Sequence, residues 1–337
     1  MKTIITLSIV LLFLLSTAAT QTRMTATASS VDMAQAATNP GPRSGHCLVY
    51  DEQLRQVILL GGHSPPSQPA LEEVWSWDGK QWELIRSTGP RARGLEGAAY
   101  DSRRKRIVMQ GGAKLEVFEG ISDTWEWDGK SWQQMTDNSV GPRDHHVMTY
   151  DEARGKTLLF GGRSATSNWP TDTWQWDGLK WAQVATQGPS GRARFGMVYD
   201  SKRKQVVLFG GTSEGRMLND TWVWDGKQWH QVSDAGPPPR YAHTMTFDQR
   251  AGVVLLYGGE NRGRQFEDMW QWDGQRWTEI KLTGAIPGHR YSPAMAYDAA
   301  RGKTVLYGGS DYVQGKKEWK VFDDTWEWDG KQWRQVR

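Results

Sequence analysis

Hydrophobic residues in this chain fall in short runs of four to six positions, separated by turns rich in glycine, aspartate and basic residues. Residues 47–50 and 206–209 are two such runs. Continuous apolar runs of this length, bounded by turn residues, are typical of strands that are buried on both faces. No helical periodicity of useful length follows residue 40. The pattern therefore predicts an all-β protein.

The spacing of tryptophans predicts a hairpin after each pair of apolar strands. Trp222 and Trp224 stand two positions apart, so they share one face of a third strand. Asp225 and Gly226 form the turn, because glycine tolerates the positive φ of a tight turn. A fourth strand begins near Trp229, where contact with Trp224 across the strands would fix the register.

The same unit recurs along the chain at intervals of 48 to 50 residues, counted between Gly-Gly pairs. These pairs begin at Gly61, Gly111, Gly161, Gly210, Gly258 and Gly308. The Trp-x-Trp-Asp-Gly strings that follow them begin at Trp75, Trp125, Trp174, Trp222, Trp270 and Trp326. A third tryptophan closes each unit, at Trp82, Trp132, Trp181, Trp229, Trp277 and Trp333. An arginine opens each unit, at Arg43, Arg93, Arg143, Arg192, Arg240 and Arg290.

Six copies of a four-stranded antiparallel unit predict a six-bladed β-propeller. The boundaries are expected at about 41–88, 89–140, 141–187, 188–235, 236–283 and 284–337. Each unit is too small to bury both faces alone, so it must pack against its neighbours. Packing between blades explains the repeated tryptophans, and crowding at a strand end explains the Gly-Gly pairs.

An opening arginine, a second strand ending in Gly-Gly and a tryptophan in the fourth strand resemble the kelch repeat. The resemblance covers about 297 of the 337 residues. The Asp-Thr-Trp-x-Trp-Asp-Gly variant resembles exported kelch proteins that are similar to the propeller domain of galactose oxidase. This resemblance implies that the first strand of each blade lines the central channel. Many kelch propellers close by lending a terminal strand to the first blade. Here the repeats start with a first strand and end with a fourth, so we expect closure by side-chain packing between blades 1 and 6.

Composition and charge restrict the partners and the compartment. The chain has 41 basic and 38 acidic residues, a net charge of +3. This small charge does not provide the positive electrostatic potential that binding of nucleic acid requires. Residues 1–19 combine Lys2, an apolar run and small residues at 17 and 19, which predicts a signal peptide. Its apolar run of twelve residues is too short to span a membrane. Residues 20–40 are expected to be a flexible leader. The mature protein is therefore expected to be secreted or periplasmic.

Metal and cofactor chemistry is not expected. A galactose oxidase copper site needs tyrosine and histidine ligands, a tyrosine–cysteine crosslink and a further domain, and only Cys47 could supply the thiol. His46, His146 and His243 share one register on alternate units, but a similar histidine in kelch repeats is structural, and symmetry would spread these three around the ring. We therefore predict no metal site and no cofactor.

A ligand site is expected at the end of each blade where the opening arginine and the Gly-Gly pair meet. The segments between Gly-Gly and the first tryptophan vary from 11 to 17 residues, and variable loops on a rigid scaffold are common binding sites. Two tryptophans outside the repeat pattern, Trp169 and Trp319, lie in these loops. Hydrogen bonding between blades is the alternative role for most of the arginines. The candidate ligand-binding residues are Arg43, Arg93, Arg143, Arg192, Arg240, Arg290, Trp169 and Trp319.

Three classes of function remain. The first is a module that binds a carbohydrate, an acidic small molecule or a protein. The second is an enzyme, because some exported six-bladed kelch proteins are mutarotases or epimerases of acidic sugars; Glu96 and His146 are then the acid–base candidates. A structural protein of the cell surface is the third. Nucleic acid and a membrane span are not expected in any of them.

Overall fold

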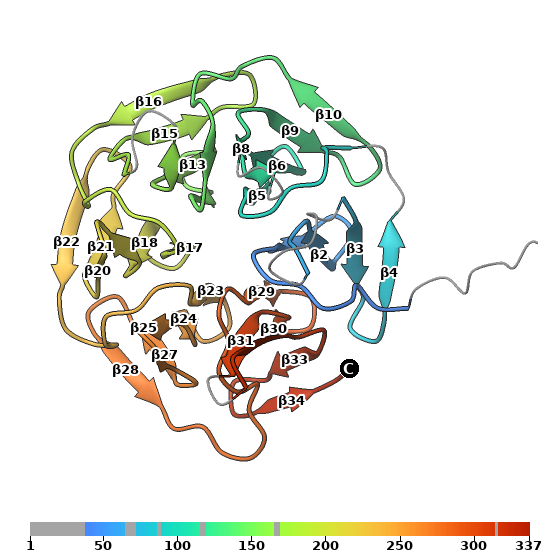
Figure 1. The fold of residues 1–337 in the computed structure, drawn as a ribbon. Helices are drawn as coiled ribbons and strands as arrows, with labels where there is room; N and C mark the ends of the chain where they lie inside the picture. The colour runs from blue at the N-terminus through green and yellow to red at the C-terminus, as the bar shows by residue number, and fades with distance from the viewer. Residues whose placement is uncertain (1–37, 65–71, 86–88, 115–118, 165–168, 314–315) are drawn as a thin grey trace, which may run out of the picture. The chain divides into compact units, whose positions relative to one another are not determined.

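The fold is an all-β, six-bladed propeller. The computed structural model describes residues 38–64, 72–85, 89–114, 119–164, 169–313 and 316–337, so the predicted signal peptide lies outside the described residues. Six four-stranded antiparallel sheets follow one another around a ring (Figure 1), and the described residues contain no helix. The predicted fold class is confirmed.

Each blade is built from strands that are consecutive in the sequence, leaving aside short loop hairpins. Blade 1 holds β1 (Cys47–Asp51), β2 (Gln56–Leu60), β3 (Val74–Trp77) and β4 (Trp82–Ile85). Blade 2 holds β5 (Gly97–Asp101), β6 (Arg106–Gln110), β9 (Thr124–Trp127) and β10 (Trp132–Met135). Blade 3 holds β12 (Val147–Asp151), β13 (Lys156–Phe160), β15 (Thr173–Trp176) and β16 (Trp181–Ala185).

The remaining three blades repeat this plan. Blade 4 holds β17 (Gly196–Asp200), β18 (Gln205–Phe209), β21 (Thr221–Trp224) and β22 (Trp229–Ser233). Blade 5 holds β23 (Thr244–Asp248), β24 (Val253–Tyr257), β27 (Met269–Trp272) and β28 (Trp277–Ile280). Blade 6 holds β29 (Ala294–Asp298), β30 (Lys303–Tyr307), β33 (Thr325–Trp328) and β34 (Trp333–Gln335).

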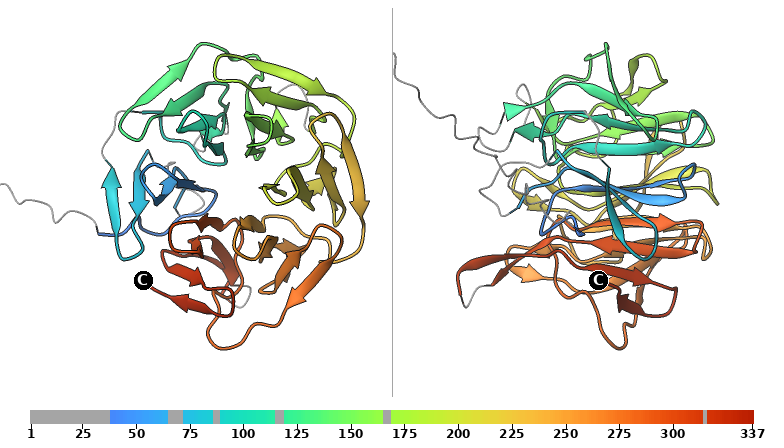
Figure 2. Two further views of the ribbon diagram at one scale, coloured as in Figure 1. Left: turned by 180° about the vertical axis from the view of Figure 1, so that it is seen from behind. Right: turned by 90° about the vertical axis from the view of Figure 1, so that its right-hand side faces the viewer.

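Two-stranded ladders form on what we call the loop face, four of them within the loops after the Gly-Gly pairs and one between such a loop and the segment of an opening arginine. They are β7 (Ala113–Lys114) with β8 (Glu119–Gly120), β11 (Arg143–Asp144) with β14 (Arg163–Ser164), β19 (Thr212–Ser213) with β20 (Arg216–Met217), β25 (Glu260–Asn261) with β26 (Arg264–Gln265), and β31 (Ser310–Val313) with β32 (Glu318–Val321). The last of these is the longest and projects beyond the blade sheets in the side view of Figure 2.

The hydrophobic core consists of layers between adjacent blades. In one layer Leu158 and Phe160 of blade 3 pack against Phe195 and Trp224 of blade 4. The predicted register contact is present, since Trp224 pairs with Trp229 across β21 and β22 with ring centroids 5.5 Å apart. First strands line the channel and fourth strands form the outer rim (Figure 1).

A hydrogen bond between tryptophan and threonine joins most neighbouring blades. The closing tryptophan donates its indole N–H to the threonine at the start of the third strand in the preceding blade, at 2.9 Å. The pairs are Trp82–Thr325, Trp181–Thr124, Trp229–Thr173 and Trp277–Thr221. Val74 and Met269 replace the threonine in blades 1 and 5. The indole nitrogens of Trp132 and Trp333, which face them, have no partner among the described residues.

A second contact between blades is present at the same four interfaces as the tryptophan–threonine hydrogen bond. The arginine of the turn between first and second strands lies against the glycine of the next blade's Asp-Gly turn. The pairs are Arg104–Gly178, Arg154–Gly226, Arg203–Gly274 and Arg301–Gly79. Leu54 and Ala251 occupy this position in blades 1 and 5. The interfaces between blades 1 and 2 and between blades 5 and 6 therefore lack both contacts.

Closure between blades 6 and 1 uses backbone hydrogen bonds as well as the expected side-chain packing. Val57 and Trp82 of blade 1 pack with Tyr307 of blade 6. The Arg43 N–H donates to the Phe322 carbonyl at 3.1 Å, and the Gly309 N–H donates to the Arg43 carbonyl at 2.9 Å. The expectation of closure by side chains was therefore incomplete.

The blade layers predict a large difference between two tryptophans. Trp224→Ala should lower the free energy of unfolding by about 3–5 kcal/mol, because it empties a fully buried site. Trp319→Ala should cost under about 1 kcal/mol, since its side chain is 43 % exposed. Denaturant titration measures both values. Equal losses would show that Trp319 belongs to the framework.

The incomplete interfaces predict that Val74→Thr stabilises the protein. The new hydroxyl can accept the buried Trp132 N–H, which should add about 0.5–1 kcal/mol. Thr173→Val is the matched reverse change and should cost about 1–3 kcal/mol, because it removes the acceptor of Trp229. Thermal and chemical denaturation compare the two variants. A destabilised Val74→Thr protein would show that the Trp132 N–H does not limit this interface.

Candidate ligand site at the channel mouth

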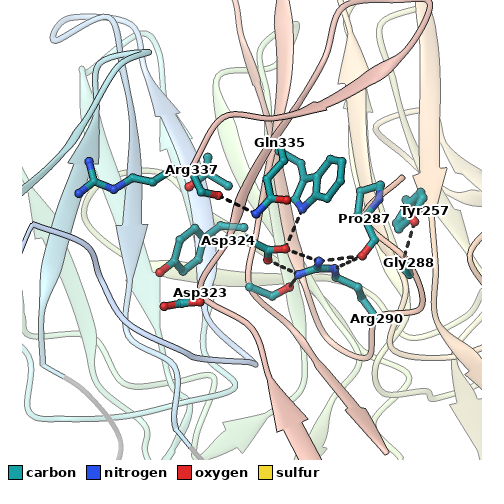
Figure 3. Close-up of polar contacts among 12 residues, drawn as sticks. Tyr257, Pro287, Gly288, Arg290, Asp323, Asp324, Gln335 and Arg337 are labelled. Atoms are coloured by element: carbon teal, nitrogen blue, oxygen red, sulfur yellow. Dashed lines mark hydrogen bonds and ion pairs between the residues drawn. The ribbon is translucent and has the colours of Figure 1, made fainter. Parts of the chain in front are cut away.

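The six opening arginines are buried inside their own blades. Each guanidinium donates to the carbonyl of the first glycine in the Gly-Gly pair and to an acid two residues before the first tryptophan. For Arg290 these bonds are 2.9 Å to Gly308 and 2.5 and 2.7 Å to Asp324, as Figure 3 shows. The other acids, in chain order, are Glu73, Asp123, Asp172, Asp220 and Asp268.

The acid of each pair also holds the first tryptophan. Asp220, for example, accepts the indole N–H of Trp222 at 2.7 Å and the Arg192 guanidinium at 2.7 and 2.8 Å. Burial raises the pKa of such an aspartate, but the arginine outweighs it through hydrogen bonds and charge. The pKa therefore lies below the usual value in Asp123, Asp172, Asp220 and Asp268.

These contacts give the arginines a framework role, but within their own blades and not between blades, where the alternative interpretation placed their hydrogen bonds. Their exposure does not exceed 3 % in any blade. Removing one would leave a carboxylate and a glycine carbonyl without their donor, so it would damage the blade itself. Contact with a ligand stays a prediction for Arg43, Arg93, Arg143, Arg192, Arg240 and Arg290.

The residue two positions after each arginine forms a ring around the channel mouth. These six residues all have positive φ, between 49° and 64°: Gly45, Leu95, His145, Arg194, Ala242 and Ser292. Each donates its N–H to the carbonyl of its counterpart in the preceding blade, at 2.8 to 3.4 Å, and the Gly45 N–H closes the circle on Ser292. Non-glycine residues seldom adopt this conformation without a reason. The backbone ring fixes the mouth and leaves its side chains free to differ.

Arg194 is the charged residue that this ring carries to the mouth. Its guanidinium lies 5.9 Å from the ring centre of Tyr241 and 5.5 Å from that of Tyr291, and it donates to the Tyr291 hydroxyl. It thus reaches from blade 4 to blades 5 and 6. Within the described part of the chain it makes no ion pair with a carboxylate. Arg194 is therefore a cation with no carboxylate of the described residues at ion-pair distance, while the Glu260 carboxylate accepts a hydrogen bond from the Tyr241 hydroxyl beside it.

Aromatic side chains extend this site along blade 6. Trp319 pairs with Tyr312 across β31 and β32, with ring centroids 5.3 Å apart, and its ring centroid lies 5.9 Å from that of Tyr291. The structure thus brings one predicted tryptophan to the mouth. Trp169 is half-buried, and its backbone carbonyl lies against Gly191 of blade 4. A ligand role for either tryptophan stays a prediction.

A second polar group lies on the blade 3 side of the mouth. His145 Nδ1 is 2.5 Å from Asp144 Oδ1, and Arg163 Nε donates to the same oxygen at 2.9 Å. Burial lowers the pKa of His145 to about 4, against the raising effect of Asp144 and together with the charge of Arg194. Burial and then Arg194 also lower the pKa of His63. Arg194 therefore acts on the pKa of both histidines, with burial as the larger cause.

Glu96 and His146, the acid–base candidates, occupy positions between blades. The His146 ring lies beside Gly111, where a Cβ would stand 3.1 Å from its Cε1, and Glu96 lies in the equivalent place beside Gly61. Both carboxylate oxygens of Glu96 lack a hydrogen-bond partner among the described residues. Burial raises the pKa of Glu96 to about 8 and lowers that of His146 to about 3. A catalytic role for either stays a prediction.

Below the ring, the channel encloses a cavity of about 380 Å³. Its mouth is lined by Leu95, His145 and Arg194, and its walls by the first strands of all six blades. Ligand sites usually measure about 300–1,000 Å³, so this space suits a small molecule. Arg194 and His145 lie at the predicted end of the blades, but the sequence pattern did not single them out. The signal that could have found them is that the residue two positions after the opening arginine differs from repeat to repeat.

No protein-family model matches the chain, and no curated protein is similar to it. Among the described residues, no cluster of three or more histidine, cysteine, aspartate or glutamate side chains could hold a metal ion. Nor does that part of the chain contain a helix long and apolar enough to cross a membrane.

Because the pKa of buried Glu96 is raised, we expect the free energy of unfolding to fall as the pH rises. Its pKa is about 8 in the folded protein and near 4.5 when unfolded, so the folded state retains a proton that the unfolded state has lost. The free energy of unfolding should therefore decrease between pH 6.5 and 8, by up to about 1.4 kcal/mol per pH unit. The buried histidines do not contribute, since their stability loss begins below pH 6.5. Glu96→Gln should flatten this dependence in denaturation curves; an unchanged slope would contradict the assignment.

Proposed function

We propose that the protein is an exported kelch-type propeller that binds a small anionic ligand at the channel mouth. This proposal depends on the position of the Arg194 guanidinium at the channel mouth. The guanidinium crosses from blade 4 to Tyr241 and Tyr291, and among the described residues it forms no ion pair with a carboxylate. A cation on a ring of fixed backbone, above a cavity, is a preorganised binding group for a carboxylate.

The surrounding residues support a ligand that combines an anionic group with a ring. Tyr291 and Trp319 present aromatic surfaces next to the guanidinium. Such surfaces stack against the apolar face of a sugar or against another aromatic ring. An acidic carbohydrate satisfies both requirements and fits a cavity of about 380 Å³. Binding would not depend on the six framework arginines.

Binding of glucuronate, with glucose as the neutral comparison, tests this proposal by isothermal titration calorimetry on the full chain. Glucuronate should bind more tightly than glucose, and Arg194→Ala should weaken glucuronate at least tenfold, because a paired charge near a buried site is lost. Arg216→Ala is the matched control, since Arg216 is an exposed arginine of the same blade in β20. Equal affinity in the wild type and Arg194→Ala would overturn the proposal.

A further inference from the structure

The position of His145 suggests more than a passive contact. It belongs to the same backbone ring as Arg194, and the Arg194 N–H donates to the His145 carbonyl at 3.4 Å. Both side chains line the cavity. An anion held by Arg194, which is half-buried, would therefore sit next to the buried, titratable ring of His145.

Asp144 determines which nitrogen of that ring can titrate. Its Oδ1 lies 2.5 Å from His145 Nδ1, so Nδ1 carries the hydrogen and donates it to the carboxylate. Arg163 fixes the carboxylate from the paired strand β14 and lies farther from Nδ1, at 3.3 Å. The basic lone pair is therefore on Nε2. This arrangement orients a histidine as an acid–base group.

Burial and the surrounding charges together set the protonation of His145. Burial is the main cause of its low pKa, and Asp144 opposes burial through its hydrogen bond and charge. Arg194 from blade 4 and Arg163 from β14 act with burial, and His146 lies next in the chain. Arg194 is the one cation of this set that an anionic ligand at the mouth would neutralise.

We propose that Asp144 and His145 form an acid–base pair that takes up a proton when an anionic ligand binds to Arg194. The inference rests on the proposed function. The proton comes from solvent and forms an N–H bond at Nε2, while the negative charge of the ligand compensates for the imidazolium. No other bond forms or breaks. The pair then presents a proton donor to the ligand, the requirement for an acid–base reaction on an acidic carbohydrate.

Proton uptake on binding determines how the affinity for the ligand changes with pH. If binding takes up a proton, the affinity must rise as the pH falls, because the two equilibria are reciprocal. Calorimetry with glucuronate at pH 6, in two buffers of different ionisation enthalpy, measures the protons taken up. We expect a clear uptake in the wild type and an affinity that rises at least threefold from pH 7 to pH 5. In His145→Gln the affinity should no longer change over this range.

The outcomes separate the two proposals. Binding without proton uptake would overturn the acid–base pair and leave the anion site intact. Failure of both glucuronate and inorganic sulfate to bind would overturn the anion site and the pair with it. Uptake that persists in His145→Gln would assign the proton to another group, such as His63, and would also overturn this inference.

A measurement without ligand tests the pair itself. Nitrogen-15 NMR at neutral pH should show the His145 ring protonated at Nδ1, and Asp144→Asn should alter that spectrum. Asp225→Asn is the matched control, because Asp225 accepts from the exposed His230 at 3.0 Å and should affect only that ring. An Nε2-protonated His145 in the wild type would contradict the proposed geometry.

Discussion

The buried pair between the opening arginine and its acid is the interaction on which each blade depends. The guanidinium joins the Gly-Gly end of the second strand to the start of the third, and the acid also holds the first tryptophan. A buried guanidinium is costly unless its donors are satisfied. In blade 4 Arg192 bonds the carboxylate, the Gly210 carbonyl and Ser190. Because these acceptors satisfy its donors, the buried guanidinium can act as a structural element of the blade. It also fixes where the loop face begins, at the end of the second strand.

Contacts between blades are repeated less evenly than contacts within blades. The tryptophan–threonine bond and the arginine–glycine contact are both present at the interface of blades 6 and 1, where the chain closes its ring. Both are missing between blades 1 and 2, where Glu96 also lies buried without a partner among the described residues. The junction of first and last blades therefore has both contacts, whereas the interfaces of blades 1 and 2 and of blades 5 and 6 have neither.

The repeat carried most of the predictive power of the sequence. Six recurrences of arginine, Gly-Gly and Trp-x-Trp-Asp-Gly specify strands, turns and the number of blades, since each copy confirms the others. The same regularity did not reveal the framework role of the opening arginines. Six identical arginines invite a shared binding role, but identical side chains in identical places reflect the unit's own framework. Nothing in the spacing showed that Asp172 or Asp324 would occupy those guanidinium groups.

The mouth shows what a repeat leaves free to vary. Gly45, Leu95, His145, Arg194, Ala242 and Ser292 share one backbone conformation and one circle of hydrogen bonds. Their backbones satisfy the fold, so their side chains are not constrained by it. At this position every repeat has the same backbone but a different side chain. A repeat protein can therefore place a binding group there without disturbing its framework. Arg194 and His145 meet this condition. Glu96 and His146 do not, because each follows a ring residue by one position and packs against a glycine of the neighbouring blade.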